Sequence, residues 1–334
     1  MSKARFVKGF QLTNANGDID PASAGFRYIT ETLTYIRSKI IEQKFYEVPI
    51  ADFLPVDVGE ASWSDEIVQN LAFQTSGGFF DGDVDTAQGA ARLATVDAAL
   101  SPVRMPVRTW AKAAAWTVFE IEKAAAAGNW DVVATKMSAL KKSWDLGIQQ
   151  CAFLGHPSVA AITGLLNNPN VNIDTSLLPV HISAMTPAQF ATFVGSVLEA
   201  YFNNTNATAM PDTLILPMSD FLGLGAPVSS TYPVNSMLSY LQDLFQRMTA
   251  NDKFEIKGLA YADATRNAAY GLNKNRAVLY RRDPDTLSMS IPVDLTMLEA
   301  DTSNKINWQQ PAYGQYSGVL ISRPREVYYI DEQA

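Results

Sequence analysis

Few side chains in this sequence have the types and spacing that catalysis or metal binding requires. The two histidines, His156 and His181, stand outside any His-x-x-x-His or Cys-x-x-Cys pattern, so we expect neither a metal site nor a cofactor. His156 precedes a proline, which favours a turn residue over a general base. Gly223 and Gly225 lack the rest of a dinucleotide-binding fingerprint, and the sequence contains no phosphate-binding loop or nucleophile elbow.

A single thiol and a pair of carboxylates are the other candidates for chemistry. Cys151 is the only cysteine, and its place on the apolar side of a predicted helix favours a buried, inert thiol over a nucleophile. Asp65 and Glu66 could supply the two carboxylates of a glycosidase, although adjacent acidic residues are common on protein surfaces. A cytoplasmic carboxylate-dependent glycosidase therefore stays open as an alternative, and no residue is assigned a catalytic role.

One long helix, predicted over residues 130–154, organises the elements around these side chains. Asn129 is the expected N-cap, Asp131 falls in the first turn, and Gly155 ends the helix. Spacings of three and four residues place one apolar stripe on the helix, whereas the lysines and Gln149 are expected on its other sides. The stripe consists of Val133, Met137, Leu140, Trp144, Ile148 and Cys151.

The segments before this helix have opposite charges. Residues 1–44 are net basic, and residues 45–100 carry ten acidic residues against one arginine. Strand candidates at 47–50 and 66–73, a glycine-rich centre and a return strand at 105–116 predict a long two-stranded excursion. Its aromatic residues would be costly to leave in water, so we expect another subunit to cover them. The candidate contacts are Trp63, Phe73, Phe79, Phe80, Asp81 and Asp83, together with Arg5, Lys8 and Lys39 of the basic arm.

The segments after residue 116 predict short connections and a second lobe. Thr117 and Glu120 form a capping box for a short helix, and the turn-rich segment 154–172 is interpreted as a hinge. A second capping box begins at Thr186, where Pro187 occupies the first helical position. Alternating helices and strands follow from there to residue 281, and the tail has strand candidates at 287–299 and 316–330.

The composition limits the kinds of partner that we expect for this protein. A net charge of −8 and a pI near 4.9 argue against broad affinity for nucleic acid or anionic membranes. The sequence has no apolar run of about 18 residues, and its first ten residues lack a secretory signal, so we expect the protein to remain in a cytoplasm and to have no membrane partner.

The order of these segments resembles the major capsid proteins of tailed bacteriophages. The matching features are a basic arm, an acidic excursion, a return strand, a long helix, an α/β lobe and final strands. The run from Phe153 to Leu166, with Gly155 and Gly164 as its glycines, matches the family's pattern after the long helix. The stretches VGEASWSDEI, beginning at Val58, and RMPVRTWAKAA, beginning at Arg104, are similar to one subfamily.

The resemblance implies an α+β capsid fold and a structural, non-enzymatic function. The implied parts are an N-terminal arm (1–44), an extended β-hairpin loop (45–104), a peripheral domain with the spine helix (105–172), an α/β axial domain (173–286) and return strands of the peripheral domain (287–334). The implied function is self-assembly, through pentamers and hexamers, into an icosahedral virion capsid around double-stranded DNA. A portal is an expected partner, and scaffolding or decoration proteins are optional ones. An encapsulin-type protein compartment is the alternative within the same fold.

Overall fold

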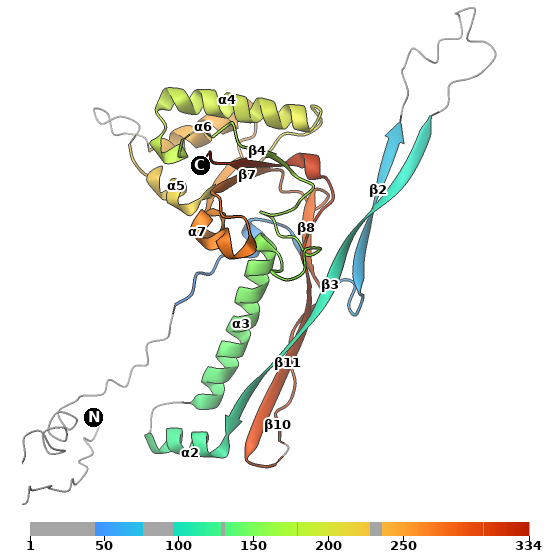
Figure 1. Cartoon of the computed structure of the whole chain (residues 1–334), viewed down its shortest axis with the longest axis vertical. Coiled ribbons are helices and arrows are strands. Elements are labelled where there is room, and N and C mark those ends of the chain that lie inside the picture. The colour runs from blue at the N-terminus through green and yellow to red at the C-terminus, as the bar shows by residue number, and fades with distance from the viewer. Residues whose placement is uncertain are drawn as a thin grey trace, which may run out of the picture. The chain divides into compact units, whose positions relative to one another are not determined.

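The computed structural model describes residues 44–75, 96–127, 131–178, 180–227, 236–302 and 304–333 (Figure 1). The described residues from 47 to 126 and from 131 to 333 form one compact unit, in which three sheets combine with helices. The mixed α+β class expected from the sequence is therefore confirmed.

Strand β3 (Asp97–Thr117) is the central element of the first sheet. Its first part pairs antiparallel with β2 (Glu66–Thr75), from Asp97 opposite Thr75 to Pro106 opposite Glu66. Its second part pairs with β11 (Asn307–Ser317), which also pairs with β9 (Val293–Met297) and β10 (Asp301–Thr302). The predicted strand at 66–73 and the return strand at 105–116 are confirmed, although β3 begins before residue 105. The expected strand at 47–50 is wrong, because a 3₁₀ turn at Ile50–Asp52 begins there.

Helix α2 (Val118–Ala127) follows β3 directly, and α3 (Val132–Leu154) is the spine helix. The α2 capping box is confirmed: Thr117 N donates to Glu120 Oε2 at 3.1 Å, and Glu120 N donates to Thr117 Oγ1 at 3.2 Å. Asp131, not Asn129, caps α3, because its carboxylate accepts a hydrogen bond from Ala134 N. Gly155 ends the helix with a φ of 72°, as its position predicts.

Helix α3 lies beside β3 and β11 (Figure 1), and its apolar stripe packs against these strands. Leu140, Trp144 and Ile148 are buried, and Val133 and Met137 are half-buried. Leu140 shares a hydrophobic cluster with Ala114 and Trp116 of β3 and Ala312 of β11, and Val133 and Met137 pack against this cluster. The periodicity of the sequence therefore identified the buried side of the helix.

Gln149 differs from the prediction because it is buried in the last turns of α3. Its Oε1 accepts a hydrogen bond from Val48 N at 3.0 Å, and its Nε2 donates to Tyr261 Oη at 3.0 Å. Both partners are distant in sequence, so helical spacing alone could not reveal them. The end of α3 is covered on more than one side, and Cys151–Leu154 are all buried there.

The segment after α3 is closely packed, so its interpretation as a hinge is wrong. A Cβ atom added to Gly155 would lie 2.5 Å from Ile162 O, and one added to Gly164 would lie 2.5 Å from Gly155 N. The amides of Leu165 and Leu166 donate to the carbonyls of Ala152 and Phe153 at 2.8 and 2.9 Å. These glycines allow two backbone segments to approach closely.

The second lobe contains a five-stranded sheet in the order β4-β13-β7-β5-β6. The strands are β4 (Asn172–Asp174), β13 (Val327–Asp331), β7 (Arg276–Tyr280), β5 (Thr213–Pro217) and β6 (Glu255–Leu259). Helices α4 (Pro187–Asn204) and α6 (Met237–Thr249) share a core cluster with this sheet. Short helices α5 (Met218–Gly223) and α7 (Ala264–Asn267) complete the lobe. The Thr186–Gln189 capping box is confirmed.

The C-terminal strands are divided among all three sheets. Strand β8 (Leu287–Ile291) pairs with β1 (Val56–Val58) and β12 (Val319–Ile321), and Pro292 separates it from β9. Strand β11 was not predicted, because Pro311 and its polar residues hide the strand pattern. Strand β13 pairs with β7 in the α/β lobe, which differs from the expectation that residues 287–334 all return to the peripheral domain.

Candidate assembly surfaces

The structure shows the surroundings of the side chains that the sequence suggested for chemistry. Burial raises the pKa of Cys151 to about 12, so the thiolate that a nucleophile requires is scarce at neutral pH. His156 Nδ1 accepts a hydrogen bond from Ser158 N at 3.1 Å, which confirms its turn position. Glu66 is exposed and pairs with Arg104 at 3.3 Å. In the described ranges, no three His, Cys, Asp or Glu side chains are grouped to hold a metal ion.

A small acidic cluster surrounds His181, which the sequence did not indicate. His181 Nδ1 lies 2.9 Å from Glu332 Oε1 and 3.5 Å from Asp220 Oδ1. Asp220 is buried on α5, and its Oδ1 also accepts a hydrogen bond from Ser183 Oγ at 3.1 Å. Among the described residues, its Oδ2 has no hydrogen-bond partner. Burial raises the pKa of Asp220, while the Ser183 hydrogen bond and His181 act in the opposite direction.

We expect the ionisation of Asp220 to lower the free energy of unfolding of the subunit as the pH rises above about 4. A carboxyl group with a higher pKa in the folded state binds more protons there, so the free energy of unfolding falls while the group ionises. Urea unfolding of the subunit and of Asp220→Asn, measured from pH 4 to 7, checks this. The variant should gain stability relative to the unchanged chain as the pH rises. A difference that is constant across the series would contradict the expectation.

Trp63 and Phe73 are the predicted contact residues that the structure describes. Trp63 is 64% exposed, its ring centroid lies 5.8 Å from that of Tyr313 on β11, and its backbone N–H donates to Gln315 Oε1 at 2.8 Å. Phe73 is 54% exposed on β2. Trp63 therefore lies against β11, whereas Phe73 lies farther along the sheet, where β2 pairs with the first part of β3.

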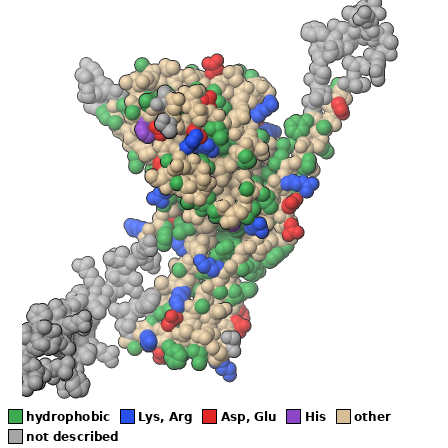
Figure 2. Space-filling view, viewed as in Figure 1, with side chains coloured by type: hydrophobic (Ala, Val, Ile, Leu, Met, Phe, Trp, Pro, Cys, Tyr) green, Lys and Arg blue, Asp and Glu red, His purple; other side chains and the backbone are tan. Residues whose placement is uncertain are grey.

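The hairpin formed by β2 and the first part of β3 exposes apolar side chains on both faces. Val68 and Leu100, which are 47% and 72% exposed, lie on one face, and Phe73 lies on the other. Figure 2 shows hydrophobic side chains along this part of the molecule. Exposed apolar side chains on both faces of a two-stranded extension are typical of a surface that contacts another molecule.

The two edges of the hairpin differ in their capacity to pair with another strand. Val107 N donates to Asp65 O, so the odd-numbered amides of β3 point toward β2, and the even-numbered positions point to the opposite edge. Pro102 and Pro106 occupy even positions and remove donors from that edge, which protects it from pairing. Strand β2 is the end strand of its sheet and contains no proline. A further strand can therefore add to β2 more readily than to β3.

The comparisons with known proteins assign this architecture to a family. Residues 86–332 match the family described as "Major capsid protein". The chain belongs to this family. It is a structural component of a virion capsid rather than an enzyme.

Solved capsid structures share the fold of this major capsid protein. It is similar to the capsid of Myoviridae Phage XM1, with a TM-score of 0.74 and 15% identity over 90% of this chain and 97% of that one. The mature capsid of bacteriophage PhiM1 has a TM-score of 0.57 and 10% identity over 98% and 96% of the two chains. A Mycobacterium phage Ogopogo chain has a TM-score of 0.56 and 14% identity over 91% and 98%. A comparison with curated protein sequences found no match.

The other predicted contact residues of this major capsid protein lie outside the described residues. They are Arg5, Lys8 and Lys39 of the arm, and Phe79, Phe80, Asp81 and Asp83 of the excursion. The described helices include none that is long and apolar enough to cross a membrane.

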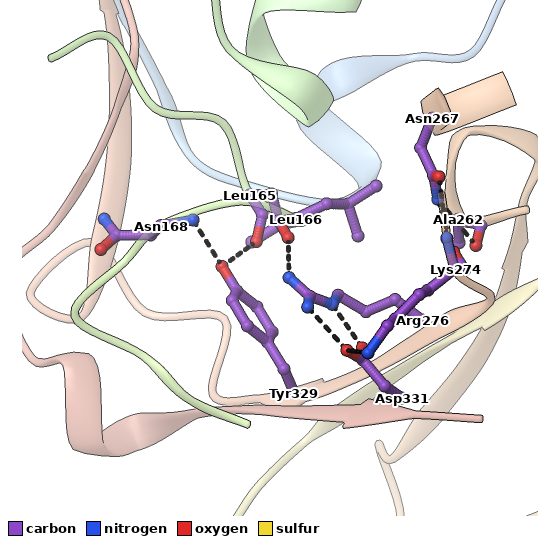
Figure 3. A network of polar contacts seen from close by, with 9 residues as sticks. All are labelled: Leu165, Leu166, Asn168, Ala262, Asn267, Lys274, Arg276, Tyr329 and Asp331. Carbon is purple, nitrogen blue, oxygen red and sulfur yellow. Dashed lines mark hydrogen bonds and ion pairs between the residues drawn. The ribbon is translucent and has the colours of Figure 1, made fainter. Parts of the chain in front are cut away.

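A buried ion pair joins the segment after α3 to the sheet of the second lobe (Figure 3). Arg276 of β7 donates from Nε to Asp331 Oδ1 at 2.6 Å and from Nη2 to Asp331 Oδ2 at 2.9 Å. Its Nη1 donates to Leu166 O at 2.6 Å, and its guanidinium stacks on the Tyr329 ring at 4.6 Å. Tyr329 Oη donates to Leu165 O at 2.6 Å and accepts from Asn168 N at 3.2 Å. These contacts hold the two lobes of the major capsid protein together.

Proposed function

We propose that this chain self-assembles into the icosahedral shell that encloses the double-stranded DNA genome of a tailed bacteriophage. The observation that carries the proposal is the β2–β3 hairpin, which exposes apolar side chains on both faces in a chain of the major capsid protein family. A neighbouring subunit under this hairpin would bury the surface that its own chain leaves open. Trp63 on the adjacent sheet face adds a second exposed aromatic contact.

The proposed shell uses the domains that the sequence assigns, except that strand β13 joins the axial domain. Residues 1–44 would be the arm, 45–104 the extended loop, 105–172 and 287–326 the peripheral domain, and 173–286 with β13 the axial domain. Copies of the axial domain would meet in pentamers and hexamers, with contacts that close by symmetry. A portal, with scaffolding or decoration proteins as optional partners, would complete the particle in the host cytoplasm. The net charge of −8 suits a container that must let DNA move during packaging.

Electron microscopy of the purified full-length protein tests the proposal. We expect closed shells of uniform size, and particles isolated from the native source should contain DNA that is protected from nuclease. Uniform small globules under all assembly conditions would contradict the proposal. Closed shells that contain protein cargo instead of protected DNA would assign the chain to an encapsulin-type compartment.

We expect the mature shell to have no covalent cross-links between subunits. An isopeptide bond from the extended loop requires a lysine amine, and no lysine occurs from Phe45 to Ala111. Mature particles boiled in denaturant and reductant should therefore give one band near 36.5 kDa on a gel. Asn304 and Asn307 could accept such a bond, but the extended loop has no lysine amine to attack their side chains. A ladder of multimers would overturn the expectation.

A further inference from the structure

An aromatic pocket lies beside the C-terminal half of α3. It has a volume of about 200 Å³, and its lining includes Trp110, Trp144, Gly147, Cys151, Tyr270 and Tyr316. We call it the Trp144 pocket. A dry apolar cavity of roughly 150 Å³ can hold a benzene ring, so the Trp144 pocket has room for one phenyl group.

Gly147 makes the pocket accessible from outside. It is exposed on α3, and a Cβ atom added there would meet no other atom within 4 Å. Glycine in the middle of a helix destabilises it relative to alanine, so the residue that leaves this space open lowers the stability of α3. The gap in the helix surface is the opening through which a side chain could enter.

The rim of the Trp144 pocket is basic. Arg108 and Lys112 lie on the same face of β3 as Trp110, because side chains two residues apart in a strand point the same way. Lys112 Nζ donates to Ser143 Oγ at 3.1 Å, and Ser143 lines the pocket. Arg108 pairs in register with Tyr316, which also lines it. The described lining residues include no carboxylate. An occupant with an aromatic ring next to carboxylates would complement both the lining and the rim.

Residues 79–85 of the excursion have this composition. Phe79 and Phe80 are followed by Asp81, Asp83 and Asp85, with no basic residue among them. On this basis, and on that of the proposed shell, we propose that the Trp144 pocket of one subunit receives Phe79 or Phe80 from the excursion of a second copy. The carboxylates that follow would then lie near Arg108 and Lys112.

The length of the chain requires that the excursion come from a second copy. Trp110 lies 13 residues along β3 from Asp97, which corresponds to roughly 43 Å of strand. Phe80 is five residues beyond Thr75, the partner of Asp97, so it can reach back at most roughly 18 Å. A phenylalanine of this excursion therefore cannot fill the pocket of its own chain. The arm of residues 1–44 also contains phenylalanines, but it is net basic and would be repelled by the rim.

Disulfide trapping in assembled particles tests the pairing. The chains carry Cys151→Ser, which removes the only native cysteine, together with Phe80→Cys and Gly147→Cys. After oxidation of shells verified by microscopy, we expect a ladder at multiples of 36.5 kDa on a gel without reductant. The matched control replaces Gly147→Cys by Gly195→Cys, a glycine of α4 whose added Cβ also meets no atom within 4 Å, and should stay monomeric.

A monomer band from closed shells of the Gly147→Cys pair, or an equal ladder from the Gly195→Cys control, would overturn the proposal. A ladder from Phe10→Cys with Gly147→Cys would assign the pocket to the arm and would also overturn it. Failure of the unchanged chain to form any shell would instead refute the proposed function.

A second variant blocks the pocket without removing a contact from the fold. Gly147→Leu places a side chain in the open space, and the unassembled subunit should melt at or above the temperature of the unchanged chain. We expect its shell yield to fall at least tenfold, while Gly195→Leu assembles normally. Normal assembly of Gly147→Leu would overturn the proposal.

Discussion

Replacing Trp144 by alanine is expected to lower the free energy of unfolding of the unassembled subunit by about 3–5 kcal/mol. Its side chain is 4% exposed, and its ring centroid lies 5.2 Å from that of Trp110 and 6.2 Å from that of Tyr316. A Cβ atom added to Gly314 would lie 2.4 Å from the indole, so the ring packs directly on the β11 backbone. Truncation would leave a cavity between α3 and the sheet that neighbouring backbone cannot fill.

Urea denaturation of Trp144→Ala and the unchanged subunit measures this loss. Phe119→Ala is the control, because Phe119 is exposed on α2 and its removal should change stability by no more than about 0.5 kcal/mol. Equal midpoints for Trp144→Ala and the unchanged chain would show that α3 does not pack on the sheet through this side chain.

Asp331→Asn should destabilise the subunit by a similar amount, about 3–5 kcal/mol. Both members of the Arg276–Asp331 pair are buried, so the substitution leaves the Arg276 charge in the interior without its carboxylate. The loss should appear as a lower urea midpoint. The exposed Arg104–Glu66 pair is the matched control, and Glu66→Gln should cost only about 0–1 kcal/mol.

A double variant separates the unpaired charge from the lost hydrogen bonds. Arg276→Met combined with Asp331→Leu removes both charges and should recover part of the stability that Asp331→Asn loses. The recovery should be incomplete, because Leu166 O loses its donor, at a cost of about 1–3 kcal/mol. If the double variant is less stable than the single one, the buried charge is not the cause of the loss.

The sequence predicted the elements that local patterns specify. The spine helix, both capping boxes and the strand at 66–73 follow from spacing and end signals within short windows. The apolar stripe identified Leu140, Trp144 and Ile148 because helical periodicity reports which side is buried. The family resemblance was confirmed by the match over residues 86–332.

The features that were missed depend on contacts between distant segments. Gln149 is buried by Val48 and Tyr261, and Arg276 pairs with Asp331 across 55 residues. Strand β11 contains Pro311 and few apolar residues, so its pairing with β3 determines its conformation. The Trp144 pocket combines residues of α3 with Trp110, Tyr270 and Tyr316, and no spacing rule connects them.

The strand pairing also has a consequence for synthesis on the ribosome. Strand β3 needs β11, about 200 residues later, and β7 needs β13, so residues 307–331 complete the two larger sheets. Contacts between such distant segments form slowly, and they cannot form at all until the late strands have been translated. A nascent chain that ends before Asn307 contains both hairpin strands but lacks β11, which pairs with the second part of β3. A chain that stops before Asn307 therefore cannot complete either of the two larger sheets.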